Sequence, residues 1–345
     1  MLLNFRAGIP PVVMAALATM ITASPNARAQ DASAIADAIT HIQNDEPDPA
    51  PQNRLKYVGI IQQARAVEAI PVLEAYYERT NDPVIKQGVA SALVSMGDKK
   101  NVYLNYLAAD AIQRVRNNDL GQGSVDALSY INWIANAKGP EGMSVLEEYY
   151  SRTTDPDIKA GVASVLVRMG DKREAYWNYL VALAERAVQS DAPDPFNITA
   201  GKQDDGISPD FKTWASTHAI PLEKALTMAY ELAQDLAPLA KTGDSRGVPL
   251  LRKALGSPIL LVSNVAAAGL AQANDLASVP LIVDACKRLP PERAHFLADS
   301  LLFFDDPLAQ STFRFYFPEV NVAEARAFRG GVFANIPQHP KQGYR

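Results

Sequence analysis

The clearest pattern of hydrophobic and polar positions occurs twice, over residues 72–107 and again over residues 145–180. The two copies align without a gap at a spacing of 73 residues, and 25 of the 36 paired positions are identical. Each copy begins with apolar residues at i, i+1, i+4 and i+5, which is typical of one face of a helix. A duplication of this length indicates stacked units in place of one closed core.

A second helix is predicted in each copy. It starts at Asp82 or Asp155, because an aspartate followed by proline suits an N-cap and the first helical position. It ends at Gly97 or Gly170, because glycine adopts the left-handed conformation without strain. The aspartate that comes after each of these glycines is expected to cap the next helix.

This pattern resembles the short HEAT-like repeats known from phycobilisome lyases. The matching residues lie in the second helix and the turn after it: Ile85, Lys86, Gly88, Val89, Ala90, Leu93, Met96, Gly97 and Asp98. A weaker copy spans residues 262–275, with Asn274 at the left-handed position. The resemblance covers about 70–180 and 247–310, and it implies an all-α, right-handed α-solenoid of stacked HEAT-like helical pairs. It implies little about activity, because such repeats serve many unrelated partners.

Residues 1–29 have the features of a secretory signal peptide: Arg6, an apolar run, and a small-residue site with cleavage after Ala29. They predict an exported, periplasmic protein. The rest of the chain divides into five segments: an N-terminal helix and Pro/acid-rich linker at 30–52, HEAT-like repeats at 53–188, an acidic loop at 189–210, a long helix with C-terminal HEAT-like repeats at 211–317, and a basic tail at 318–345.

Three local features are predicted within these segments. Close helix packing should offset the cost of the interior glycines Gly88 and Gly161, which is roughly 1 kcal/mol each relative to alanine. The long helix should stop before Pro238. The aromatic run 313–317 should seal the last helical pair, whose outer face has no neighbour.

Composition limits the classes of partner. The net charge is −5, and removal of 1–29 with its two arginines and no acid would give −5 − 2 = −7. An acidic chain argues against nucleic acid, and the absence of a second long apolar run argues against membrane insertion of the mature chain. The single cysteine, Cys286, cannot form an intramolecular disulfide, and its apolar surroundings predict a buried, inert thiol.

The sequence contains no recognisable catalytic constellation, metal site or cofactor motif. The four histidines have no adjacent Cys or Glu at metal-ligand spacing, and no phosphate-binding loop occurs. The acidic loop leaves an alternative open, an enzyme or enzyme-accessory protein, lyase-like or metal-dependent. Stabilisation by calcium that is lost on neutralising Asp204 and Asp205 would favour it.

Aromatic residues are the best candidates for a binding surface, because Tyr and Trp offer large contact areas at little rotamer cost. The candidates are Tyr77 and Tyr103, their equivalents Tyr150 and Tyr176, and Trp177 in the second copy. One tyrosine of each adjacent pair should face the core and the other the inner surface of the stack; alternatively, both pack between helices. We therefore predict a non-catalytic binding or scaffold protein for a protein partner, with a purely structural envelope component as a further alternative.

Overall fold

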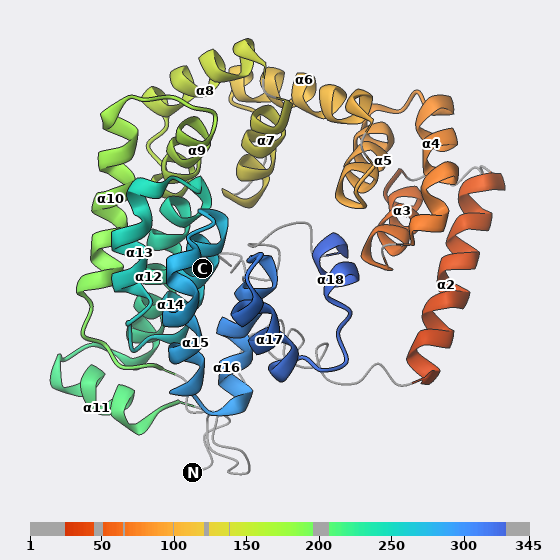
Figure 1. Cartoon of the computed structure of the whole chain (residues 1–345). Coiled ribbons are helices and arrows are strands. Elements are labelled where there is room, and N and C mark those ends of the chain that lie inside the picture. Colours follow the sequence, from red (N-terminus) through yellow and green to blue (C-terminus); the bar gives the residue numbers. More distant parts are fainter. Residues whose placement is uncertain are drawn as a thin grey trace, which may run out of the picture. The chain divides into compact units, whose positions relative to one another are not determined.

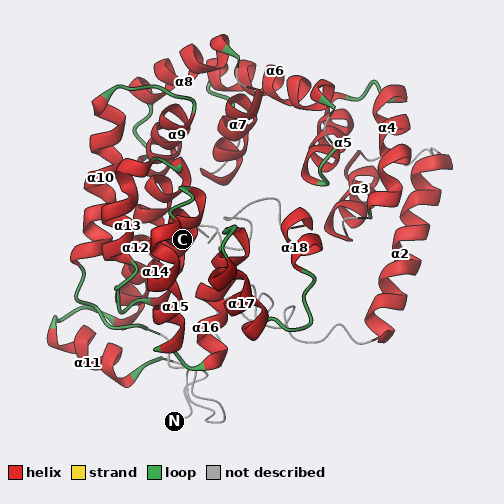
Figure 2. Cartoon of the chain, in the orientation of Figure 1, coloured by secondary structure: helices red, strands yellow, loops and turns green. Residues whose placement is uncertain are grey.

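The computed structural model describes residues 25–44, 51–64, 66–98, 100–120, 124–137, 139–195 and 207–328. Regular secondary structure in these ranges is helical (Figure 2), which confirms the all-α prediction. The chain divides into two compact units, Met1–Leu107 and Ala108–Arg345. Within the described ranges, no helix is both long enough and apolar enough to cross a membrane.

The first unit contains four α-helices, a short 3-10 turn and the start of α6 (Figure 1): α2 (Pro25–Asn44), α3 (Pro51–Ala64), η1 (Val67–Ala69), α4 (Ile70–Arg79), α5 (Pro83–Ser95) and α6 (Asn101–Asn117). Helix α5 packs against both α3 and α4. Most of the predicted signal peptide and linker lies outside the described residues, although residues 25–29 form the first turns of α2.

The second unit contains the remaining helices: α7 (Ser124–Ala137), α8 (Pro140–Arg152), α9 (Pro156–Arg168), α10 (Glu174–Gln189), α11 (Pro209–Thr217), α12 (Leu222–Thr242), η2 (Ser245–Gly247), α13 (Val248–Ala254), α14 (Leu260–Gln272), η3 (Leu276–Ser278), α15 (Val279–Lys287), α16 (Pro291–Ala298), η4 (Asp299–Phe303), α17 (Pro307–Tyr316) and α18 (Val322–Phe328). Helix α9 packs against α7, α8, α10 and α12, and α12 packs in turn against α14. Contacts between helices therefore run from each helix to its close neighbours in sequence.

The predicted helix starts and stops are confirmed. Asp82 accepts hydrogen bonds from two backbone N–H groups of α5 at 2.9 and 3.2 Å, and Asp155 from two of α9 at 2.9 and 3.1 Å. Gly97, Gly170 and Asn274 have φ values of 88°, 95° and 51°. All three therefore take the left-handed conformation that ends a helix.

The aspartate after each left-handed glycine has a different role from the predicted one. Asp98 Oδ1 accepts from the N–H of Lys100 at 2.8 Å, and Asp171 Oδ1 from the N–H of Arg173 at 2.9 Å. The N-cap of α10 is Arg173 itself, which makes no side-chain capping bond. The prediction that these aspartates cap the next helix is wrong, because each closes a turn that ends where the helix begins.

The interior glycines mark close helix packing, as predicted. A Cβ atom on Gly88 would lie 2.3 Å from Cδ2 of Leu55, and one on Gly161 would lie 2.1 Å from Cδ2 of Leu128. Leu55 and Leu128 are themselves 73 residues apart. Each glycine therefore accommodates the equivalent leucine of the preceding helix, α3 or α7.

The duplication extends beyond the 36 positions recognised from the sequence. The guanidinium of Arg79 in α4 donates to the carbonyl of Ile42 in α2, and Arg152 in α8 donates to the carbonyl of Val115 in α6. Both members of each pair differ by 73 from their counterparts. Helices α2–α5 and α6–α9 are therefore equivalent blocks, joined by contacts to backbone carbonyls that leave no trace in residue type.

Helix α12 is longer than predicted. It continues through Pro238 and ends at Gly243, whose φ is 65°. Proline removes one backbone hydrogen bond from the helix. Leu239, directly after it, is buried, and Ser164 of α9 donates a hydrogen bond to the Pro238 carbonyl at 2.6 Å. These tertiary contacts stabilise the last turn, so the prediction of a stop before Pro238 is wrong.

The C-terminal segment is only partly as predicted. Arg326, assigned to the basic tail, lies in α18 and donates to the carbonyls of Leu302 and Phe304 at 2.5 and 2.6 Å. In the aromatic run, Phe313 is fully buried whereas Phe315 is 78% exposed. The run therefore covers the core with one side of α17 only, and α18 comes after it. The remainder of the predicted tail lies outside the described residues.

Candidate binding groove around Trp177

The candidate tyrosines pack in two equivalent clusters. Tyr77 contacts Tyr103 and Tyr106 edge to face, with ring centroids 4.8 and 5.8 Å apart. Tyr150 contacts Tyr176 in the same way at 4.6 Å. Edge-to-face pairs of this kind stabilise a packed core. Four of the five candidate residues are thus brought together as packing partners, two in each copy.

A lysine covers one ring of each cluster. Lys86 Nζ lies 4.6 Å from the ring centroid of Tyr77, and Lys159 Nζ lies 4.9 Å from that of Tyr150. Burial raises the pKa of both tyrosines. Tyr77 is only 4% exposed. A partner could therefore reach little of Tyr77, and more of the half-buried Tyr150.

Trp177 has a different environment, because it lines an open groove of about 420 Å³. One wall comes from α10, at i, i+4 and i+8: Trp177, Val181 and Glu185. The opposite wall comes from α12, η2 and α13: Leu239, Arg246, Gly247, Pro249, Leu250 and Lys253. Most of these groups are apolar, with charged side chains among them. The first copy of the repeat has Leu104 at the position of Trp177.

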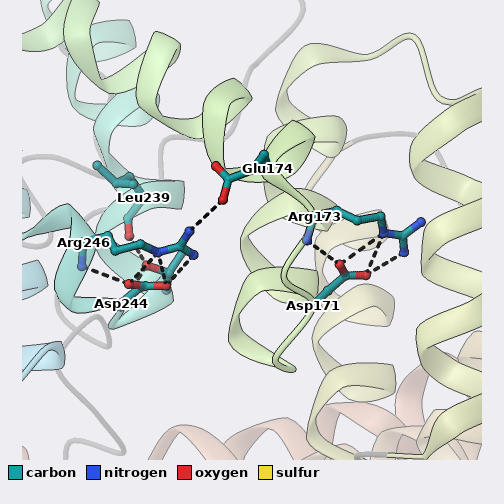
Figure 3. Close-up of polar contacts among 7 residues, drawn as sticks. Asp171, Arg173, Glu174, Leu239, Asp244 and Arg246 are labelled. Carbon is teal, nitrogen blue, oxygen red and sulfur yellow. Dashed lines mark hydrogen bonds and ion pairs between the residues drawn. The ribbon is translucent and has the colours of Figure 1, made fainter.

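Arg246 fixes the indole of Trp177. Its guanidinium lies 4.2 Å from the ring centroid. Its Nε and Nη2 atoms donate to the carboxylate of Asp244 at 2.8–3.2 Å, and Glu174 lies 3.7 Å away (Figure 3). The bonds with Asp244 raise the pKa of Arg246 and lower the pKa of Asp244. The cation is therefore held in place over the aromatic face.

The same device occurs one repeat earlier. Arg173 donates to both carboxylate oxygens of Asp171 at 2.6–3.1 Å (Figure 3), pairs with Glu147, and lies 4.8 Å from the ring centroid of Tyr176. Hydrogen bonding to Asp171 raises the pKa of Arg173 and lowers the pKa of the carboxylate. Two successive turns of the array thus pair an aspartate with an arginine that covers an aromatic ring.

This turn is not among the functional features predicted from the sequence. Its signal is Gly-Asp-x-Lys/Arg, which occurs at residues 97–100, 170–173 and 243–246 at a constant spacing of 73. The third glycine, Gly243, is left-handed like the first two. A search for this four-residue pattern alone would have found the third copy, whose flanking helices have diverged.

The acidic loop is anchored at its start. Asp194 accepts a hydrogen bond from the N–H of Leu260 at 2.7 Å and pairs with Arg293 at 2.5 Å. Trp214 Nε1 donates to Asp191 at 3.2 Å. Asp194 thereby supplies the N-terminus of α14 with an acceptor that the N-cap Ile259 lacks. Two acids of the loop are therefore structural, and residues 196–206 lie outside the described part.

Metal chemistry finds no support in the described part of the chain. No group of three or more His, Cys, Asp or Glu side chains there could hold a metal ion. His218 accepts or shares a hydrogen bond with the Trp214 carbonyl at 2.8 Å, and His295 packs on the ring of Phe317. Asp204 and Asp205, the acids named for calcium, are outside the described residues.

Cys286 is fully buried in α15, and burial raises the pKa of its thiol to about 12 from the ordinary value of 9.0. Its reaction with Ellman's reagent at pH 8 should be at least about a thousandfold slower in the native protein than in denaturant, because three pKa units suppress the thiolate by that factor. The unfolded chain loses this proton first, so stability should fall as pH rises from about 9 to about 12. Native and denatured rates within tenfold of each other would contradict the buried placement.

No protein-family model matches the chain, and no curated protein does. The groove and the repeat contacts are therefore the basis on which a function can be proposed.

Proposed function

We propose that this chain is an exported, non-catalytic α-solenoid of HEAT-like helical pairs that binds a protein partner in the Trp177 groove. Successive contacts through α7, α9, α12 and α14, and a Gly-Asp turn every 73 residues, support the solenoid and the HEAT-like family. Sequencing of the purified protein's N-terminus should begin at Gln30 if the signal peptide is removed. A chain that retained Arg6 would contradict cleavage.

The observation that carries the binding proposal is the fixed, half-exposed indole of Trp177. Binding hot spots favour tryptophan in a groove where apolar groups surround it and few rotamers are lost on association. Arg246 already restrains the ring, and Val181 and Leu250 extend the apolar surface beside it. Side chains of α10 spaced by eight residues span about 12 Å, which suits two turns of a partner helix or a short extended segment.

The internal repeat provides a conservative variant for the test. Trp177→Leu installs the residue that the first copy carries at this position, and it should keep the fold. We expect wild-type protein to recover a partner from cell-envelope extract by affinity purification, and Trp177→Leu to recover at least about tenfold less, a loss of roughly 1.4 kcal/mol. Asn178→Ala is the matched control, since Asn178 is exposed on the same helix and does not line the groove.

Equal helicity and melting temperature must first be shown for all three proteins. Equal recovery by wild type and Trp177→Leu would exclude the groove as the binding surface. Loss of recovery with Asn178→Ala as well would show that the effect belongs to α10 in general and not to the indole.

A further inference from the structure

Two cationic side chains meet at the ends of α9 and α12. The hydrogen bond from Ser164 to the Pro238 carbonyl, 2.6 Å long, joins these helices one turn before both of them end. Arg168 lies one turn after Ser164, and Lys241 lies three residues after Pro238. The positive charge of Arg168 is close enough to contribute to a lowered pKa of Lys241, after burial as the larger cause.

Arg168 stands in a hollow of the surface. Its side chain is solvent-accessible, yet burial among surrounding groups lowers its pKa. A side chain that is both reachable by water and surrounded by protein occupies a recess. Its Nη2 donates to Oδ1 of Asn132 in α7 at 3.0 Å, which orients the guanidinium, and within the described ranges Arg168 takes part in no ion pair. Charge in this recess is therefore unneutralised on the arginine side.

The first copy of the repeat lacks this feature. Its equivalent of Arg168 is Ser95, which accepts a hydrogen bond from Gln62 Nε2 at 3.0 Å and donates to a backbone carbonyl of its own helix. A neutral residue is thus sufficient for the same helix end in a closely related repeat. The arginine is an addition that the fold does not require, and burying it beside Lys241 opposes stability.

We propose that Arg168, Lys241 and Asn132 form a recess that binds a carboxylate of an acidic segment of the partner protein. This inference rests on the proposed function and specifies the chemistry of the partner. The planar guanidinium can donate two parallel hydrogen bonds to a carboxylate, the ammonium adds a second charge, and partial burial strengthens both interactions. In a chain of net charge −5, a local cationic recess gives an acidic segment one place to dock.

Labelled hexaglutamate is the probe, and its fluorescence anisotropy at low ionic strength reports binding to the full-length chain. The test variant is Arg168→Ser with Lys241→Met, which restores the first-copy residue and keeps the length of the lysine stem. The control is Lys172→Met with Lys224→Met, which removes two exposed charges elsewhere in the same unit. Unlabelled hexalysine and inorganic phosphate are the competitors.

We expect hexaglutamate to bind wild type and the control alike, and to bind the test variant at least about tenfold more weakly, with a melting temperature that is unchanged or higher. Equal binding to the test variant, or none to wild type, would overturn the proposal. Displacement by phosphate at concentrations where hexaglutamate does not compete would overturn the carboxylate assignment. Partner recovery that is lost with Trp177→Leu but kept by the test variant would remove this inference and leave the proposed function intact.

Discussion

Replacing Phe313 with alanine is expected to lower the free energy of unfolding of the second unit by about 3–5 kcal/mol. Phe313 is fully buried in α17, and its ring stacks on that of Phe317 with centroids 4.7 Å apart. Alanine would leave a cavity against the helices that α17 packs on, α15 and α16. Urea denaturation followed by circular dichroism measures the change.

The control lies two residues away on the same helix. Phe315 is 78% exposed, so Phe315→Ala should change the free energy of unfolding by no more than about 0.5 kcal/mol. Both variants remove the same number of atoms and differ only in burial. Similar losses for the two would contradict an orientation of α17 in which Phe313 faces the core and Phe315 faces solvent.

Replacing Gly269 with alanine should destabilise the second unit by about 1–3 kcal/mol. A Cβ atom at Gly269 in α14 would lie 2.7 Å from Cβ and 3.0 Å from Cα of Ala240 in α12, and 3.0 Å from Leu251. Ala240 contributes backbone at this contact and cannot turn aside as a long side chain would. Thermal melting of the variant therefore measures how closely α12 and α14 approach.

Gly59→Ala provides the opposite expectation. Gly59 lies inside α3, and a Cβ atom there would meet nothing within 4 Å. Its replacement should raise the free energy of unfolding by up to about 1 kcal/mol through helix propensity. If both glycine replacements shifted stability in the same direction, the close contact between α12 and α14 would be in error.

The features predicted correctly from the sequence depend on residue type within one turn of chain. Asp82 and Asp155 act as caps, and Gly97, Gly170 and Asn274 adopt the left-handed conformation, because each geometry demands a particular kind of residue. Periodicity over 36 positions also sufficed for the helical class. These effects are local, so a single sequence contains them.

The features that could not be predicted depend on neighbours distant in the chain. Helix α12 passes through Pro238 because α9 supplies a partner for the proline carbonyl 74 residues away in sequence. Asp194 becomes a structural anchor only because the start of α14 and Arg293 lie beside it. Among the aromatic candidates, residue type could not separate the packed Tyr77 from Trp177, whose groove forms when α13 lies alongside α10.

The claim that the groove is a binding surface is tested most directly by photo-crosslinking in cells that produce the protein. Benzoylphenylalanine at position 253, on the rim of the groove, is compared with the same residue at position 224, which does not line it. We predict a discrete crosslinked product from position 253 that is absent from position 224 and disappears when Trp177→Leu is added. The same products from both positions, or a product at 253 that survives Trp177→Leu, would contradict a binding role for the groove.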